Sequence, residues 1–154
     1  MENTITELLN KNYNNINDEE LKSHIFRYIC VLVSGYLETE LNKVIDNYKN
    51  CEHFNNHECK NTINSQRKIQ NAKWCSIRPF FANIDDNFIS QLKDKLNDFD
   101  EIVGSIDTIV RTRHKIAHGE NNIPVLSKDN LERYFSNIKI FLEKIQECIN
   151  ELES

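Results

Sequence analysis

The sequence contains few of the residues that break helices or form tight turns. Among 154 residues there are only 3 glycines and 2 prolines, whereas β-sandwiches and β-barrels need such residues at their many turns. No segment shows the sustained alternation of apolar and polar residues that is typical of half-buried strands. These absences exclude an all-β protein and favour a helical one.

Long apolar runs are also absent. The first twenty residues are polar, and nothing in the sequence resembles a signal peptide or a membrane-spanning helix. The 5 cysteines are an odd number and lack the spacing of a disulfide framework, which is typical of reduced thiols. The sequence therefore predicts a cytoplasmic protein that does not bind membranes, with Cys30 and Cys148 in its core because both lie on apolar helix faces.

Basic residues are too few for a protein that binds nucleic acid over its whole surface. There are 19 lysines and arginines against 24 aspartates and glutamates, which gives a formal net charge of −5. This balance still allows a local basic patch.

The length of the chain suits one domain with its own hydrophobic core. We expect residues 1–16 to be an N-terminal extension or a short helix and residues 17–154 to be the helical domain.

The hydrophobic periodicity is helical in three long segments. It predicts a helix that begins at Asn17 or Asp18, another from Phe99 to the region of His118, and a last one from near Ser127. The first and the last of these have acidic residues in their first turns, where the helix dipole favours them.

Two shorter segments complete the helical pattern. The stretch TINSQRKIQNAKWC, residues 62–75, is a candidate helix that ends before SIRPFFANIDD, because Pro79 disfavours helical backbone at Arg78. A further helix is expected near residues 87–97. The whole pattern predicts an all-α fold, a single-domain bundle of four to five helices.

The stretch IVRTRHKIAHGENN, Ile109 to Asn122, concentrates charge at the end of a predicted helix. Two arginines, two histidines and a lysine lie between Arg111 and His118, and Gly119 follows. Simple capping is one interpretation, because cations in the last turn complement the negative end of a helix and glycine closes it. Pro124 then prevents the helix from resuming.

Arg113 favours a second interpretation, a functional site. It falls on the apolar stripe of its helix, where an unpaired guanidinium costs several kcal/mol, so it indicates a cleft or a subunit interface. Helical spacing puts Arg111, His114 and His118 on one side, whereas Arg113 and His118 stand about 140° apart. Fraying at Gly119, or a second copy of the motif across a two-fold axis, could bring them together.

The segment RHKIAHG, Arg113 to Gly119, resembles the signature of the HEPN superfamily, an arginine followed after four to six residues by a histidine. Its IAHG part is similar to the RiboL-PSP-HEPN branch, small all-α proteins of bacterial defence and toxin loci. VLVSGYLETEL resembles the early helix of that family with its acidic residue, here Glu38. The branch usually carries asparagine where His114 stands, and Arg111 also satisfies the longer spacing. We favour Arg113 as the motif arginine.

This resemblance implies a metal-independent endoribonuclease that needs no cofactor and acts as a homodimer with a composite active site. RNA is the implied substrate, and the implied products are a 2′,3′-cyclic phosphate and a 5′-hydroxyl. A toxin or antiviral effector of this kind could have an antitoxin or another defence protein as partner. The residues implied to act in catalysis are Arg113, His114 and His118, with Arg111, Lys115 and Glu38 in support.

The sequence is compatible with two alternatives. One is a HEPN-like module that binds RNA or protein without cutting, and the other is a helical interaction protein in which the charged cluster only caps its helix. Glu38 could pair with Arg113 and offset the burial of the guanidinium, or its carboxylate could simply face water.

Residues 60–84 contain no acidic residue but several basic and aromatic ones. They could form an RNA-binding surface, or a solvated face whose aromatic residues belong to the core. The basic residues proposed to contact RNA are Arg67, Lys68, Lys73 and Arg78.

A compact set of metal-ligand residue types occurs in CEHFNNHEC. Cys51, His53, His57 and Cys59 are of the types that bind zinc, but their spacing is unlike that of known zinc sites. The spacing favours chance clustering, and we predict no metal site there.

Overall fold

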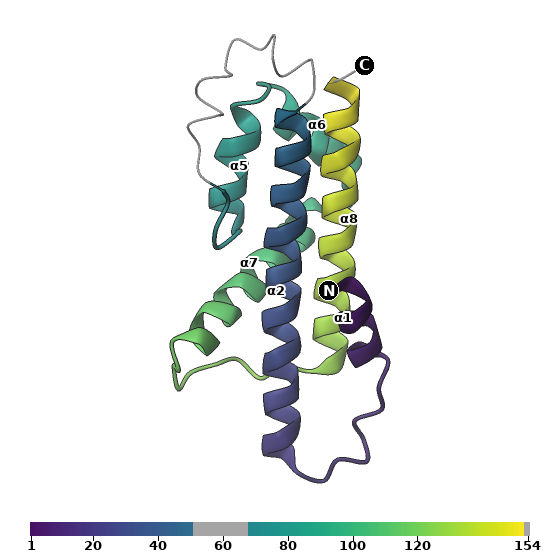
Figure 1. Cartoon of the computed structure of the whole chain (residues 1–154), viewed down its shortest axis with the longest axis vertical. Coiled ribbons are helices and arrows are strands. Elements are labelled where there is room, and N and C mark those ends of the chain that lie inside the picture. Colours follow the sequence, from purple (N-terminus) through teal and green to yellow (C-terminus); the bar gives the residue numbers. More distant parts are fainter. Residues whose placement is uncertain (51–67, 153–154) are drawn as a thin grey trace.

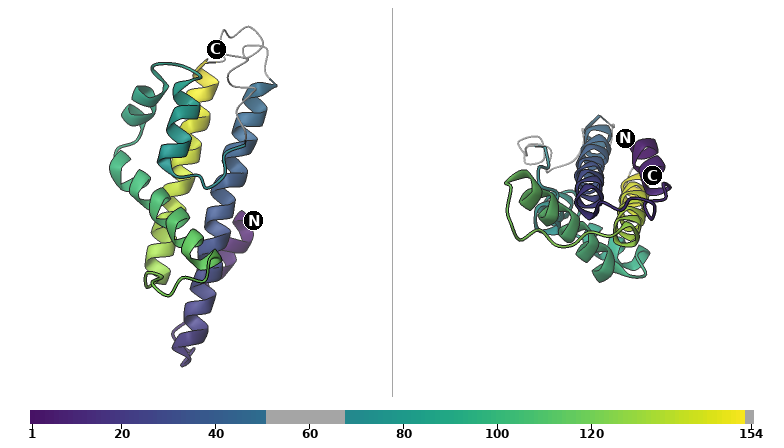
Figure 2. Two further views of the ribbon diagram at one scale, coloured as in Figure 1. Left: turned by 90° about the vertical axis from the view of Figure 1, so that its left-hand side faces the viewer. Right: turned by 90° about the horizontal axis from the view of Figure 1, so that it is seen from below.

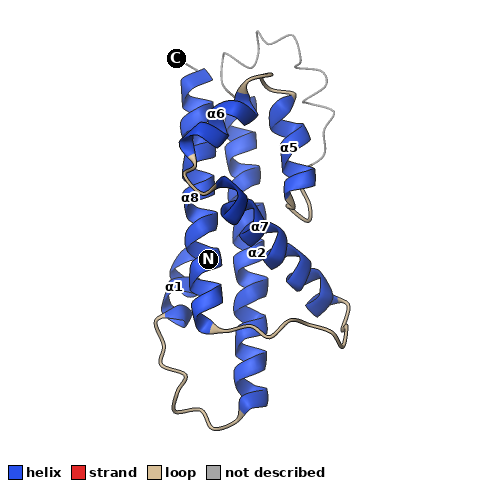
Figure 3. Cartoon of the chain, turned by 180° about the vertical axis from the view of Figure 1, so that it is seen from behind, coloured by secondary structure: helices blue, strands red, loops and turns tan. Residues whose placement is uncertain are grey.

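The computed structural model describes residues 1–50 and 68–152, and all the regular secondary structure within them is α-helix (Figure 1, Figure 3). The predicted all-α fold is confirmed for these ranges, but the predicted four to five helices are too few, since six are present. They are α1 (Glu2–Leu9), α2 (Glu19–Lys49), α5 (Trp74–Ala82), α6 (Phe88–Lys95), α7 (Phe99–Ala117) and α8 (Lys128–Leu152).

Helices α2 and α8 lie side by side and form the long axis of the molecule (Figure 1, Figure 2). Helix α7 packs against both and crosses them obliquely, while α1 packs on α2 and α8 and buries Ile5 and Leu9. Helices α5 and α6 cover the other end of the bundle. Towards its C-terminus, α7 diverges from α8, so its last turn lies at the edge of the bundle (Figure 3).

Helix α2 begins where the sequence predicts. The carboxylate of Asp18 accepts a hydrogen bond of 3.0 Å from the backbone N–H of Leu21, which satisfies one of the free donors of the first turn. Glu19 and Glu20 follow in that turn, near the positive end of the helix dipole. Local sequence signals therefore fix the start of the longest helix.

The prediction for residues 62–82 is wrong where the structure describes them. Residues 68–73 are not helical, and α5 covers the segment that we expected to be non-helical, with Pro79 inside it. Proline removes one N–H donor and restricts the preceding residue. Burial of Ile77, Phe80 and Phe81 opposes this cost, so tertiary packing outweighs the local preference.

The aromatic residues of this region belong to the core. Trp74 packs edge-to-face on Phe99 and Phe141, with ring centroids 5.3 and 6.1 Å away, and Phe81 stacks on Phe88 at 4.8 Å. Such pairs stabilise a core beyond the burial of their area. The interpretation of these aromatic rings as core residues is confirmed.

The two cysteines predicted to lie in the core are buried. Cys30 and Cys148 are both 0% exposed, and burial raises the pKa of the Cys30 thiol to about 12.

None of the helices that the structure describes is long and apolar enough to cross a membrane.

Candidate functional site at the end of α7

Helix α7 ends in a hydrogen-bonded cap formed by its own backbone. Gly119 has a φ of 63°, and its N–H donates to the carbonyl of Ile116 at 3.2 Å, while the N–H of Glu120 donates to that of Lys115 at 3.0 Å. This pair of bonds around a left-handed glycine is a Schellman motif. The capping role predicted for Gly119 is thus confirmed, and it fixes where the chain leaves the helix.

The two histidines of the motif lie against each other on the surface. The ring centroids of His114 and His118 are 4.3 Å apart, with an interplanar angle of 55°, and both residues are exposed. They are one helical turn apart, as the spacing predicts. The site therefore presents two adjacent imidazoles that solvent or a ligand can reach.

Arg113 lies at the margin of the buried face of α7 rather than on it. Thr112, only 2% exposed, takes the interior position in the last turns, and Arg113 is half-buried. The expectation of a core-facing guanidinium is therefore too strong. Helix α7 diverges from α8 at this end (Figure 3), and Ile116 of the apolar stripe still packs against the core but is only partly buried.

The guanidinium of Arg113 contacts a residue that sequence reasoning missed. Its Nη1 donates to Oδ1 of Asn71 at 3.4 Å. The backbone N–H of Asn71 in turn donates to Oε1 of Glu38 at 2.7 Å. Within the described ranges no ion pair joins Arg113 to Glu38 directly, so the suggested pairing is replaced by a link through Asn71. No sequence signal marks this asparagine, because the contact spans 42 residues.

The two supporting cations of α7 differ in their surroundings. Lys115 is half-buried, and its Nζ donates to the carbonyl of Asn122 at 3.3 Å, which ties the following loop to the last turn. Arg111 is exposed, and no hydrogen bond or ion pair holds it in the part of the chain that the structure describes.

The residues proposed to bind RNA do not share one environment. Lys68 forms an ion pair of 3.5 Å with Asp46, Lys73 precedes α5 as its half-buried N-cap, and Arg78 is exposed on that helix. Arg67 lies outside the described residues, as do the four possible zinc ligands, Cys51, His53, His57 and Cys59.

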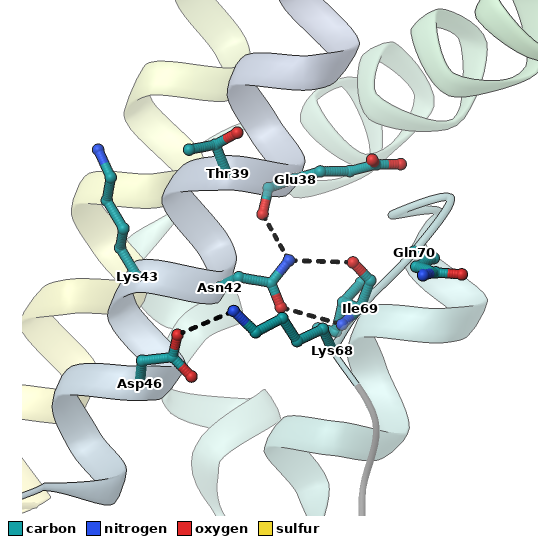
Figure 4. Close-up of a pocket in the computed structure, with 8 residues that line it drawn as sticks. All are labelled: Glu38, Thr39, Asn42, Lys43, Asp46, Lys68, Ile69 and Gln70. Carbon is teal, nitrogen blue, oxygen red and sulfur yellow. Dashed lines mark hydrogen bonds and ion pairs between the residues drawn. The ribbon is translucent and has the colours of Figure 1, made fainter.

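A groove of about 410 Å³ lies between α2 and the segment 68–70 (Figure 4). Asp46 is paired with Lys68 there, and Lys43 is held by Glu40 at 2.7 Å. Because its cations are already neutralised, the groove does not offer a phosphate the uncompensated charge that such ligands require. Its lining residues are Glu38, Thr39, Asn42, Lys43, Asp46, Lys68, Ile69 and Gln70.

An all-α bundle whose penultimate helix ends in an arginine–histidine motif at the surface is typical of the HEPN type. Comparison with protein families agrees, since residues 2–151 match the model of the RiboL-PSP-HEPN domain, and the chain belongs to that family. The match covers nearly the whole chain and includes α1. Searches among curated proteins and among solved structures found no match.

Proposed function

We propose that this protein is a metal-independent endoribonuclease, a toxin or antiviral effector of the HEPN type. The observation that carries the proposal is the arrangement at the end of α7. It combines two adjacent exposed imidazoles with an arginine anchored by a neutral acceptor, in a chain that belongs to this family.

The residue types suit RNA cleavage without a metal. The 2′-hydroxyl of RNA attacks the neighbouring phosphorus, the P–O5′ bond breaks, and a 2′,3′-cyclic phosphate and a 5′-hydroxyl result. His118 takes the proton from the 2′-hydroxyl or gives one to the leaving oxygen, since histidine changes protonation near neutral pH. Arg113 binds two non-bridging oxygens and stabilises the charge that develops on the phosphate.

A second copy of the chain completes the site in this proposal. Arg113 reaches towards Asn71, whereas His118 lies on the exposed side of the same helix beside His114. A two-fold axis next to α7 would oppose the two motifs and supply arginine and histidine from different subunits.

An exposed apolar stripe on α2 supports dimerisation. Leu21, Tyr28 and Val31 are 49%, 55% and 37% exposed and lie on the same face of the helix. Large exposed apolar residues that cluster often mark protein interfaces. We therefore propose this face of α2 as part of the homodimer contact.

The test is cleavage of a mixed RNA pool in EDTA by wild type and His118→Ala, at equal concentrations of folded protein. Arg133→Ala, which changes an exposed residue of α8, is the matched surface control. Cyclic-phosphate ends from wild type and the control, but not from His118→Ala, support the proposal. Ends of another kind, or a requirement for Mg²⁺, contradict it.

A module that binds RNA or protein without cutting is the alternative. The histidine at position 114, where asparagine is usual in the branch, favours it. Binding of RNA without cleavage by the intact dimer would establish this alternative.

A further inference from the structure

The segment 68–71 is held on α2 by one asparagine side chain. Nδ2 of Asn42 donates to the carbonyls of Glu38 and Ile69, at 2.7 and 3.0 Å, and its Oδ1 accepts from the N–H of Ile69 at 3.0 Å (Figure 4). All the hydrogen-bonding atoms of this amide thus have protein partners. The side-chain amide of Asn42 thus forms hydrogen bonds with both the N–H and the carbonyl of Ile69. These two bonds fix the position of the segment 68–71 along α2.

Two residues further on, the backbone of Asn71 is fixed from both sides. Its N–H donates to Oε1 of Glu38 at 2.7 Å, and its carbonyl accepts from the N–H of Lys73 at 2.6 Å. The residue has a φ of 49°, in the left-handed region, which asparagine adopts more readily than most residues. The direction of its side chain follows from these constraints.

That side chain ends at the motif arginine. Oδ1 of Asn71 accepts from Nη1 of Arg113 at 3.4 Å, and the two residues come from different elements of the fold. We propose that Asn71 is a positioning residue for Arg113 and that Asn42 holds Asn71 in place. The consequence for catalysis rests on the proposed function, whereas the effect on the arginine side chain does not.

The chemistry of the acceptor matters as much as its position. A direct carboxylate partner would neutralise the guanidinium and occupy two of its donors. Here the Glu38 carboxylate accepts from the Asn71 backbone instead, and a neutral amide oxygen occupies one of the five N–H groups of Arg113. The guanidinium is thereby oriented while its charge and remaining donors stay available for a phosphate.

Asn71→Gly tests this role with little disturbance of the backbone. Glycine accepts the left-handed conformation and keeps the N–H that binds Glu38, but it lacks the acceptor for Arg113. We expect kcat to fall roughly tenfold, as for a lost hydrogen bond to a charged group, with little change in KM. Asn71→Asp keeps an acceptor at the same position, so it should keep Arg113 oriented. Its carboxylate neutralises the guanidinium, so this variant is a control for the position of the side chain and not for activity.

A double-mutant cycle separates positioning from general destabilisation. If Asn71 acts through Arg113, Asn71→Gly has no further effect on cleavage in an Arg113→Ala background. Equal loss in both backgrounds would overturn the proposal.

The arginine side chain itself gives a readout that does not need activity. The ¹⁵N–¹H heteronuclear NOE of Arg113 Nε, assigned with Arg113→Ala, should fall towards that of a mobile side chain in Asn71→Gly and stay near the wild-type value in Asn71→Asp. An unchanged NOE in Asn71→Gly overturns the proposal. If wild type cuts no RNA, the proposed function fails, and the NOE still decides whether Asn71 positions Arg113.

Discussion

The imidazoles of His114 and His118 lie 4.3 Å apart between ring centroids, on the exposed side of the last turn of α7. The two rings lie one helical turn apart and both are exposed, so a ligand that reaches one of them also meets the other. Substitution of each histidine in turn reveals whether the two contribute equally to cleavage.

We expect His118→Ala to lower the cleavage rate by about a hundredfold to ten-thousandfold, the usual range for loss of a general acid or base. His114→Asn restores the residue that is usual in the branch and should retain most of the rate. The measurement is single-turnover cleavage of a defined RNA. If both variants lose the same activity, His114 shares the chemistry rather than supporting it.

Arg113 and Arg111 differ in their surroundings. Of these two arginines, Arg113 alone donates a hydrogen bond within the described residues, to the side chain of Asn71. We expect Arg113→Ala to reduce kcat/KM about tenfold to a hundredfold, as for loss of a charge-assisted hydrogen bond, and Arg111→Ala to have a smaller effect. Arg113→Lys should not restore activity, because lysine lacks the planar fork of donors. A larger loss from Arg111→Ala would reassign the motif arginine.

Two glycines of α7 should respond oppositely to alanine. Gly119 has a φ of 63°, so Gly119→Ala should destabilise the protein by roughly 1 kcal/mol through backbone strain. Gly104 is exposed within the helix, and nothing lies within 4 Å of an added Cβ, so Gly104→Ala should stabilise it by roughly 0.5–1 kcal/mol. Urea unfolding measures both, and the same sign for both would contradict the helix-end geometry.

The apolar stripe of α2 should control the oligomeric state. We expect wild type to sediment as a dimer and Tyr28→Glu to sediment as a monomer, because a buried unpaired carboxylate opposes association. Ile140→Glu changes an apolar residue of α8 that is 39% exposed and serves as the control. A Tyr28→Glu variant that remains dimeric would place the interface elsewhere.

The buried thiol of Cys30 predicts a loss of stability at alkaline pH. Its pKa rises from 9.0 to about 12 on burial, so between these values the unfolded chain loses a proton that the folded chain keeps. The free energy of unfolding should therefore fall as pH rises from 9 towards 12. Cys30→Ala should flatten this slope, whereas Cys75→Ala, which removes an exposed thiol, should not.

The long helices were predictable because each carries its own signals. Helix α2 has a capping aspartate and a continuous apolar face, and the end of α7 is marked by glycine. Helix α5 was missed because the rule for Pro79 is local, whereas the burial of Phe80 and Phe81 that stabilises the helix depends on distant residues.

The site was predictable only in the part that is contiguous in sequence. The pairing of His114 with His118 follows from helical spacing. The link from Arg113 to Glu38 through Asn71 joins three separate elements and requires a left-handed backbone. Asparagine adopts such a conformation more readily than most residues, but the sequence does not indicate which of the asparagines in the chain does so.

The hydrogen bonds that close α7 use no residue beyond Glu120. The position of His118 is therefore decided before the chain enters the loop that leads to α8. In that loop the side chain of Val125 is 93% exposed, so an insertion next to this residue displaces no buried side chain of its own. The loop could therefore change in length there while the histidine pair keeps its geometry, because the backbone bonds that fix the pair come before it in the chain.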